Sequence, residues 1–220
     1  MRFILILFGV TYTLAHEHWE ADSYHQRKRL RERVINQYRD DYKEGTCGKL
    51  TWEPILANRA DPPPKAVIAG HGRSIGIHGE DLYVCRIESI GDDPNNDATV
   101  PGKTWFERGD SCCNVAHDGK THSASECQVL TVRPRAHSGI RLEWESIRTS
   151  PNQMVPSDAL KLGNDQHYGS LYSCRFRDAN GDFVPGQTWF PRRDSRCCSA
   201  EVAGHEVTGE TCDVLVQKRC

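Results

Sequence analysis

The sequence predicts an all-β protein of two tandem antiparallel repeats, stabilised by disulfides and preceded by an N-terminal α-helix. A duplication is the first observation, because the stretch 101–113 returns as 185–198 with the same Pro-Gly-x-Thr-Trp-Phe start and the same cysteine pair at its end. From Cys47 onward, short segments rich in Val, Ile, Tyr, Trp and Phe alternate with clusters of Gly, Pro, Asn and Asp, which is typical of antiparallel strands. We expect the two copies to pack around a pseudo-twofold axis.

The N-terminus has the features of a secretory signal peptide. The basic residue Arg2 precedes an apolar run over 3–10, and Ala15 provides a small residue for cleavage, so residues 1–15 are assigned to the signal peptide. The run is too short to span a bilayer. The mature protein is therefore expected to be secreted and extracellular, without a membrane span.

Residues 16–46 are expected to form a charged helix with one narrow apolar stripe that ends at Gly45. Such a stripe could pair with a second copy, so a homodimer through this helix is a possible assembly. The stripe consists of Leu30, Val34, Tyr38 and Tyr42.

Ten cysteines in an exported chain are expected to form disulfides. The first repeat, 47–135, and the second, 136–220, each have four at matched positions and one more at the outer edge. Adjacent cysteines on a strand point to opposite faces, so Cys112 and Cys113 should bond different neighbours, most simply Cys85 and Cys127. A bond between the two edge cysteines would tie the ends of the duplicated body together, although other connectivities stay open. The ten are Cys47, Cys85, Cys112, Cys113, Cys127, Cys174, Cys197, Cys198, Cys212 and Cys220.

Several landmarks occur once in each repeat and in the same order. Trp52 and Trp144 open the copies, an Ala-Gly or Leu-Gly strand follows, and a Leu-Tyr-x-Cys-Arg segment precedes each Pro-Gly box. This order resembles the DM-nine (DM9) repeat family, tandem-repeat proteins of invertebrates whose repeat also occurs at the N-terminus of natterin-type proteins. The resemblance covers roughly residues 50–217.

Members of that family studied as lectins bind mannose. The resemblance implies that an Asp just after the Ala-Gly strand and the Lys of Pro-Gly-Lys hold sugar hydroxyls. In this chain the two are divided: the first copy has Lys103 but Gly72 at the Asp position, and the second has Asp165 but Gln187 at the Lys position.

A carbohydrate site also needs an aromatic face to cover the apolar side of a sugar ring, beside groups that donate to and accept from its hydroxyls. Trp105 and Trp189 lie two residues beyond the donor positions and would share their side of a strand. Tryptophans repeated in a duplication are also typical of a core. If the repeats face each other, Lys103, Asp165 and Gln187 could complete one site with a tryptophan.

Other patterns favour binding over catalysis. The run Gly72-Arg-Ser-Ile-Gly76 matches a hydrolase nucleophile motif only formally, because no helical pattern follows it, so Ser74 is not expected to be catalytic. Arg108-Gly-Asp110 could be adhesive, but its counterpart 192–194 retains only Arg-x-Asp, which is consistent with a local turn. No metal, cofactor or catalytic motif is predicted.

The charge balance is nearly even, with 28 Lys and Arg against 30 Asp and Glu and a net charge of -2, which argues against nucleic acid as a partner. The sequence therefore predicts a secreted, non-enzymatic protein of recognition or defence that binds mannose-type glycans on microbial or host surfaces. The alternative is an extracellular structural or protein-interaction component that retains the scaffold without sugar binding.

Overall fold

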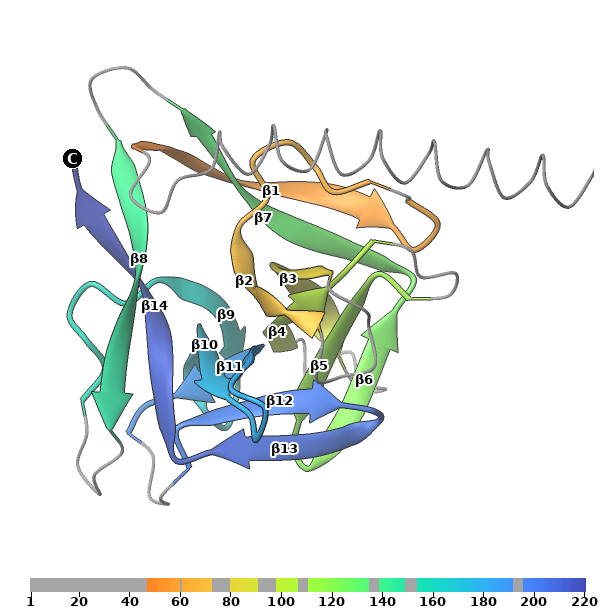
Figure 1. Ribbon diagram of the computed structural model, residues 1–220, viewed down its shortest axis with the longest axis vertical. Helices are drawn as coiled ribbons and strands as arrows, with labels where there is room; N and C mark the ends of the chain where they lie inside the picture. Colours follow the sequence, from red (N-terminus) through yellow and green to blue (C-terminus); the bar gives the residue numbers. More distant parts are fainter. Residues whose placement is uncertain are drawn as a thin grey trace, which may run out of the picture. The chain divides into compact units, whose positions relative to one another are not determined.

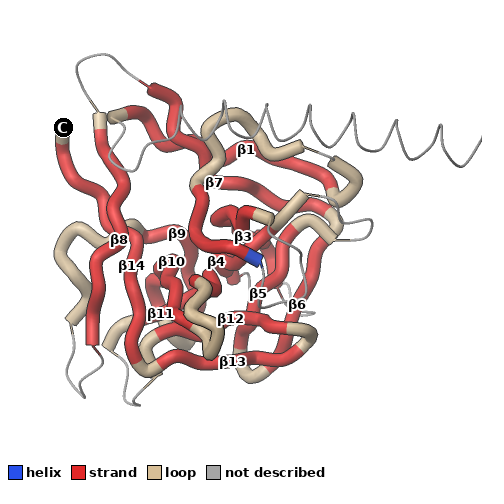
Figure 2. Tube along the Cα trace, in the orientation of Figure 1, coloured by secondary structure: helices blue, strands red, loops and turns tan. Residues whose placement is uncertain are grey.

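The computed structural model describes residues 47–59, 61–72, 80–90, 98–106, 111–134, 139–148, 154–191 and 196–220. The predicted signal peptide and N-terminal helix lie outside these residues, as does the predicted boundary between the repeats at 135 and 136. Strands dominate the described part of the chain (Figure 2), which confirms the all-β prediction. In the same part of the chain no helix is long and apolar enough to cross a membrane.

The first repeat supplies the orange to green strands of Figure 1 and the second supplies the green-teal to blue strands. The strands of the first repeat are β1 (Gly48–Leu56), β2 (Ile68–His71), β3 (Asp81–Ile90), β4 (Ala98–Thr104), β5 (Cys113–His117), β6 (Lys120–Ala124) and β7 (Glu126–Pro134). Those of the second are β8 (Ile140–Arg148), β9 (Lys161–Asp165), β10 (Gly169–Arg177), β11 (Phe183–Trp189), β12 (Cys198–Val202), β13 (His205–Gly209) and β14 (Thr211–Arg219).

These strands form one antiparallel hydrogen-bonded sheet, twelve of them in the order β13-β12-β11-β10-β14-β8-β1-β7-β3-β4-β5-β6. The other two lie off this path: β2 pairs with β3, and β9 pairs with β10 and β4. In both repeats the opening strand pairs along its length with the closing strand, β1 with β7 and β8 with β14. The register is the same, because Trp52 lies opposite Leu130 and Trp144 lies opposite Leu215. Alternating buried side chains fix such a register, since a slip by one residue would turn every side chain to the other face.

Five disulfides use all ten cysteines. In each repeat the two members of the adjacent pair bond different partners, as expected from the opposite directions of neighbouring side chains on a strand. A fifth bond, Cys47–Cys220, joins residues 173 apart in sequence and ties the two ends of the described body together. The four bonds within the repeats are Cys85–Cys113, Cys112–Cys127, Cys174–Cys198 and Cys197–Cys212.

The backbones of the two repeats are in close contact at two glycines. β9 of the second repeat pairs with β4 of the first, with Asn164 opposite Thr99. A Cβ atom on Gly163 would lie 2.0 Å from the Thr99 carbonyl oxygen, and one on Gly70 would lie 2.0 Å from the Phe183 carbonyl oxygen. Only glycine permits backbones to approach this closely, so the contact between repeats depends on both residues.

Gly163→Ala is therefore expected to destabilise the protein by about 1–3 kcal/mol or more, because the added methyl group meets backbone that cannot rotate away. Urea unfolding of the oxidised protein measures this change, with Ser170→Ala on the neighbouring strand as the control. A Gly163→Ala variant as stable as that control would show that the repeats do not need this close approach.

Candidate functional site

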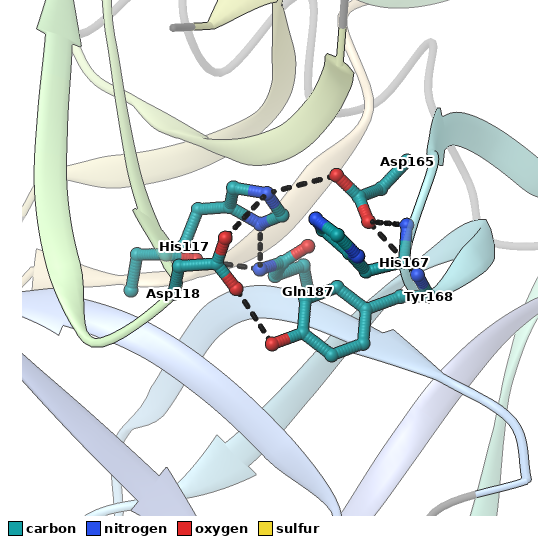
Figure 3. Close-up of polar contacts among 7 residues, drawn as sticks. His117, Asp118, Asp165, His167, Tyr168 and Gln187 are labelled. Atoms are coloured by element: carbon teal, nitrogen blue, oxygen red, sulfur yellow. Dashed lines mark hydrogen bonds and ion pairs between the residues drawn. The ribbon is translucent and has the colours of Figure 1, made fainter. Parts of the chain in front are cut away.

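A cluster of polar side chains lies where the two repeats meet (Figure 3). His117, at the end of β5, comes from the first repeat, together with Asp118 in the turn that follows. Asp165 ends β9, Tyr168 lies in the next turn, and Gln187 lies on β11, all in the second repeat. Strands from both copies are thus needed to assemble the cluster.

Asp165 is held by three donors. Its Oδ1 accepts hydrogen bonds from the backbone N–H groups of His167 at 2.7 Å and Tyr168 at 2.8 Å, an arrangement by which Asp stabilises tight turns. Its Oδ2 lies 3.3 Å from Nε2 of His117. Burial raises the pKa of Asp165, but the bonds from Tyr168 and His167, together with His117, outweigh it and hold the pKa below its ordinary value.

Gln187 determines which nitrogen of His117 carries the proton. Its Nε2 donates to the carbonyl of Ala116 at 2.6 Å and lies 3.2 Å from Nδ1 of His117. An amide nitrogen can only donate, so Nδ1 accepts and Nε2 carries the hydrogen that points to Asp165. A directed chain of hydrogen bonds therefore runs from Gln187 through His117 to Asp165 and joins the repeats.

An aromatic pair covers the outer side of this chain. The rings of Tyr168 and Trp189, both half-buried, have centroids 4.2 Å apart, and Tyr168 also meets the ring of His117 edge to face. The Tyr168 hydroxyl donates to Oδ1 of Asp118 at 2.6 Å, and this bond raises the pKa of Tyr168 to about 12. The cluster thus combines aromatic surface, a carboxylate with a side chain 45% exposed at Asp118, and a buried polar chain behind them.

Lys103, in the first repeat, contacts the second repeat in the way that Gln187, in the second, contacts the first. Its Nζ donates to Oε2 of Glu201 at 2.8 Å and also to the Glu201 carbonyl. Oε1 of Glu201 accepts from the N–H of Gly204 at 2.7 Å. Glu201 and Ala116 occupy the same place relative to the cysteine pair of their repeats. Lys103 and Gln187 therefore play equivalent parts, each donating to a carbonyl of the opposite copy.

The structure thus divides the five residues expected to bind sugar. Asp165 and Gln187 come together through His117, with Trp189 beside them, whereas Lys103 contacts Glu201. Trp105 is only 8% exposed and belongs to the core. Lys103, Asp165 and Gln187 are themselves buried, with exposed fractions of 1%, 2% and 1%.

Sequence reasoning missed His117, Asp118, Tyr168 and Glu201. One signal was available: His117 stands where the second copy has Val202, so a polar residue replaces an apolar one at matched positions. The patterns around Ser74, Arg108-Gly-Asp110 and 192–194 lie in parts of the chain that the structure does not describe.

The fold and this cluster define a class of protein: a disulfide-stabilised β-protein of duplicated repeats in which polar side chains of each copy meet those of the other. A sequence comparison specifies the family. The DM9 repeat matches residues 76–209, so the chain belongs to the DM9 repeat family, and the resemblance seen in its motifs is confirmed. A comparison with curated protein sequences gives no match.

Proposed function

We propose that the chain is a secreted, non-enzymatic carbohydrate-binding protein that recognises mannose-type glycans in a defence role. Membership of the DM9 repeat family supports carbohydrate binding in general. Five disulfides are consistent with an oxidising, extracellular compartment. The proposal includes removal of residues 1–15, a pseudo-twofold relation between the repeats, and a homodimer formed through the helix predicted over 16–46.

The observation that carries the proposal is the half-buried pair Tyr168 and Trp189 over a polar cluster shared by both repeats. An aromatic face can cover the C–H side of a sugar ring, and the Asp118 carboxylate beside it can accept from sugar hydroxyls. The buried chain behind them fixes the turn that presents Tyr168, because Asp165 accepts from the Tyr168 backbone N–H. Asp165 and Gln187 then act by positioning the aromatic surface.

The test is binding of the oxidised mature protein to a glycan array, with and without calcium, and with free mannose as the competitor. Mannose-inhibited binding is the expected result. Tyr168→Phe removes the hydroxyl that holds Asp118 and is expected to weaken binding by about threefold to tenfold, because a typical hydrogen bond contributes about 1 kcal/mol and this one acts on the ligand only through Asp118. Tyr172→Phe, on the next strand, serves as the control and should bind normally.

A second candidate function is an extracellular structural or interaction component that has kept the scaffold without a sugar site. The burial of Lys103, Asp165 and Gln187 favours it, because side chains with exposed fractions of 1–2% join the repeats and present almost no surface to a ligand. An array without signal, combined with a folded and monodisperse protein, would support this candidate and contradict the first.

A further inference from the structure

The outer face of β1, β7 and β3 carries a cleft that the proposal above does not use. Pro54 lies opposite Gln128, and Gln128 lies opposite Arg86, so the three side chains form a row across the strands (β1, β7 and β3 in Figure 1). The cleft has a volume of about 400 Å³, within the range of pockets that bind small ligands. The rest of its lining consists of Ile55, Leu56, Glu88, Glu126 and Cys127.

Arg86 is held in one orientation at this cleft. Its guanidinium lies 4.2 Å from the centroid of the Trp52 ring, a stacking geometry that favours arginine over lysine. Nε donates to Oε1 of Gln128 at 2.8 Å, and Nη2 donates to Oε1 of Glu88 at 3.1 Å. Nη1 takes part in neither bond. A donor fixed in advance binds a ligand without the entropy cost of ordering it.

The second repeat has the same stack of an arginine on a tryptophan, but there the arginine makes further contacts. Arg175 lies 4.5 Å from the Trp144 ring centroid and also contacts the ring of Phe183 at 3.9 Å. Asp213 stands where the first repeat has Gln128, and its Oδ2 accepts from Nε of Arg175 at 2.9 Å. Ser146, in the place of Pro54, donates to the other carboxylate oxygen at 2.5 Å. The arginine is thus neutralised by a carboxylate that is itself held.

The two repeats share the stack of an arginine on a tryptophan but differ in the groups that pair with the arginine. Both repeats use an arginine on a tryptophan, but only the first pairs its arginine with a neutral amide. Gln128 does not neutralise the guanidinium, and the partner that does, Glu88, has a side chain 52% exposed. The same scaffold neutralises its arginine with Asp213 in one copy and presents a polar cleft beside its arginine in the other.

We propose that this cleft is a second binding site, and that its ligand is a short neutral oligosaccharide. Arg86 supplies donors, Glu88 and Glu126 supply acceptors, and Pro54 and Leu56 supply apolar surface, with Leu56 55% exposed. Two carboxylates beside one guanidinium disfavour an anionic ligand. Vicinal hydroxyls can use the donor and the acceptors together. The proposal does not depend on the cluster around Tyr168 and Trp189.

The test uses nuclear magnetic resonance of the full oxidised mature chain, with methyl α-mannoside and diacetylchitobiose as probes. At least one sugar is expected to shift the indole N–H signal of Trp52 and the Nε–H signal of Arg86 in a saturable manner. The variant Pro54→Ser/Gln128→Asp copies the arrangement of Ser146 and Asp213. It is expected to weaken the affinity measured from these shifts by about tenfold or more, because the new carboxylate pairs with Arg86.

Glu126→Ala, a change at an exposed residue, gives a second variant if the double substitution impairs folding, and it should weaken the same shifts. The signal of Trp189 separates the two sites. Shifts at Trp189 alone would overturn the second site while supporting the first, and unchanged Trp52 and Arg86 signals with both sugars would overturn it outright. A cationic peptide such as trilysine that shifts Trp52 where neither sugar does would overturn the ligand class.

Discussion

Lys103→Ala is expected to lower the free energy of unfolding by about 3–5 kcal/mol, the usual cost of removing one partner of a buried ion pair. The substitution leaves the carboxylate of Glu201, a residue only 8% exposed, without its charged donor. It also removes the hydrogen bond from Nζ to the Glu201 carbonyl in the other repeat. The loss should appear in urea unfolding of the oxidised protein at neutral pH.

Two further variants make this expectation specific. Lys103→Gln/Glu201→Ala copies the arrangement of Gln187 and Ala116 in the opposite half, so it should recover part of the stability. Lys218→Ala removes a lysine that pairs with Asp158 and Glu145 at the surface, where solvent screening leaves ion pairs little weight, so only a small change is expected. If Lys103→Ala is as mild as Lys218→Ala, the Lys103–Glu201 pair does not join the repeats.

The strand and disulfide plan was readable from the sequence because it is encoded locally and encoded twice. Alternation within short segments indicates strands, and the shared spacing of Trp52 and Trp144 indicates equivalent opening strands. The adjacent cysteines at 112 and 113 imply different partners from strand geometry alone. None of these inferences needs to know how one repeat lies on the other.

The candidate site, in contrast, depends on how one repeat lies on the other. The sequence pattern of the strands does not decide whether Lys103 and Asp165 lie together or apart. Their placement depends on the pairing of β4 with β9, which is set by the close approach of the backbones at Gly163. His117 joins Gln187 to Asp165 across the repeats, yet its only signal in the sequence is that the second copy has Val202 at the matched position, and this does not reveal its partners. Contacts between the two repeats leave no periodic pattern in the sequence near the residues that make them.

Asp165→Ala is expected to cost about 3 kcal/mol or more at neutral pH. Three donors lose a charged acceptor, and hydrogen bonds to charged groups contribute about 1.5–3 kcal/mol each. The pKa of Asp165 in the folded protein lies below its ordinary value of 3.8. The stabilisation is therefore complete above about pH 5 and is lost as the pH falls through the folded pKa. The gap between wild type and variant should accordingly narrow in acid.

Urea unfolding over a series of pH values measures this gap, with Asp158→Ala as the control. The pKa of Asp158 is also lowered, chiefly by its hydrogen bond from Lys218, but this pair is at the surface, so salt should erase its effect and leave that of buried Asp165 in place. The outcome also decides which role Asp165 has. An Asp165→Ala protein that keeps its stability but no longer binds mannose would assign the carboxylate to the sugar. One that loses stability, and binds mannose while it remains folded, would make Asp165 a support for the contact between repeats.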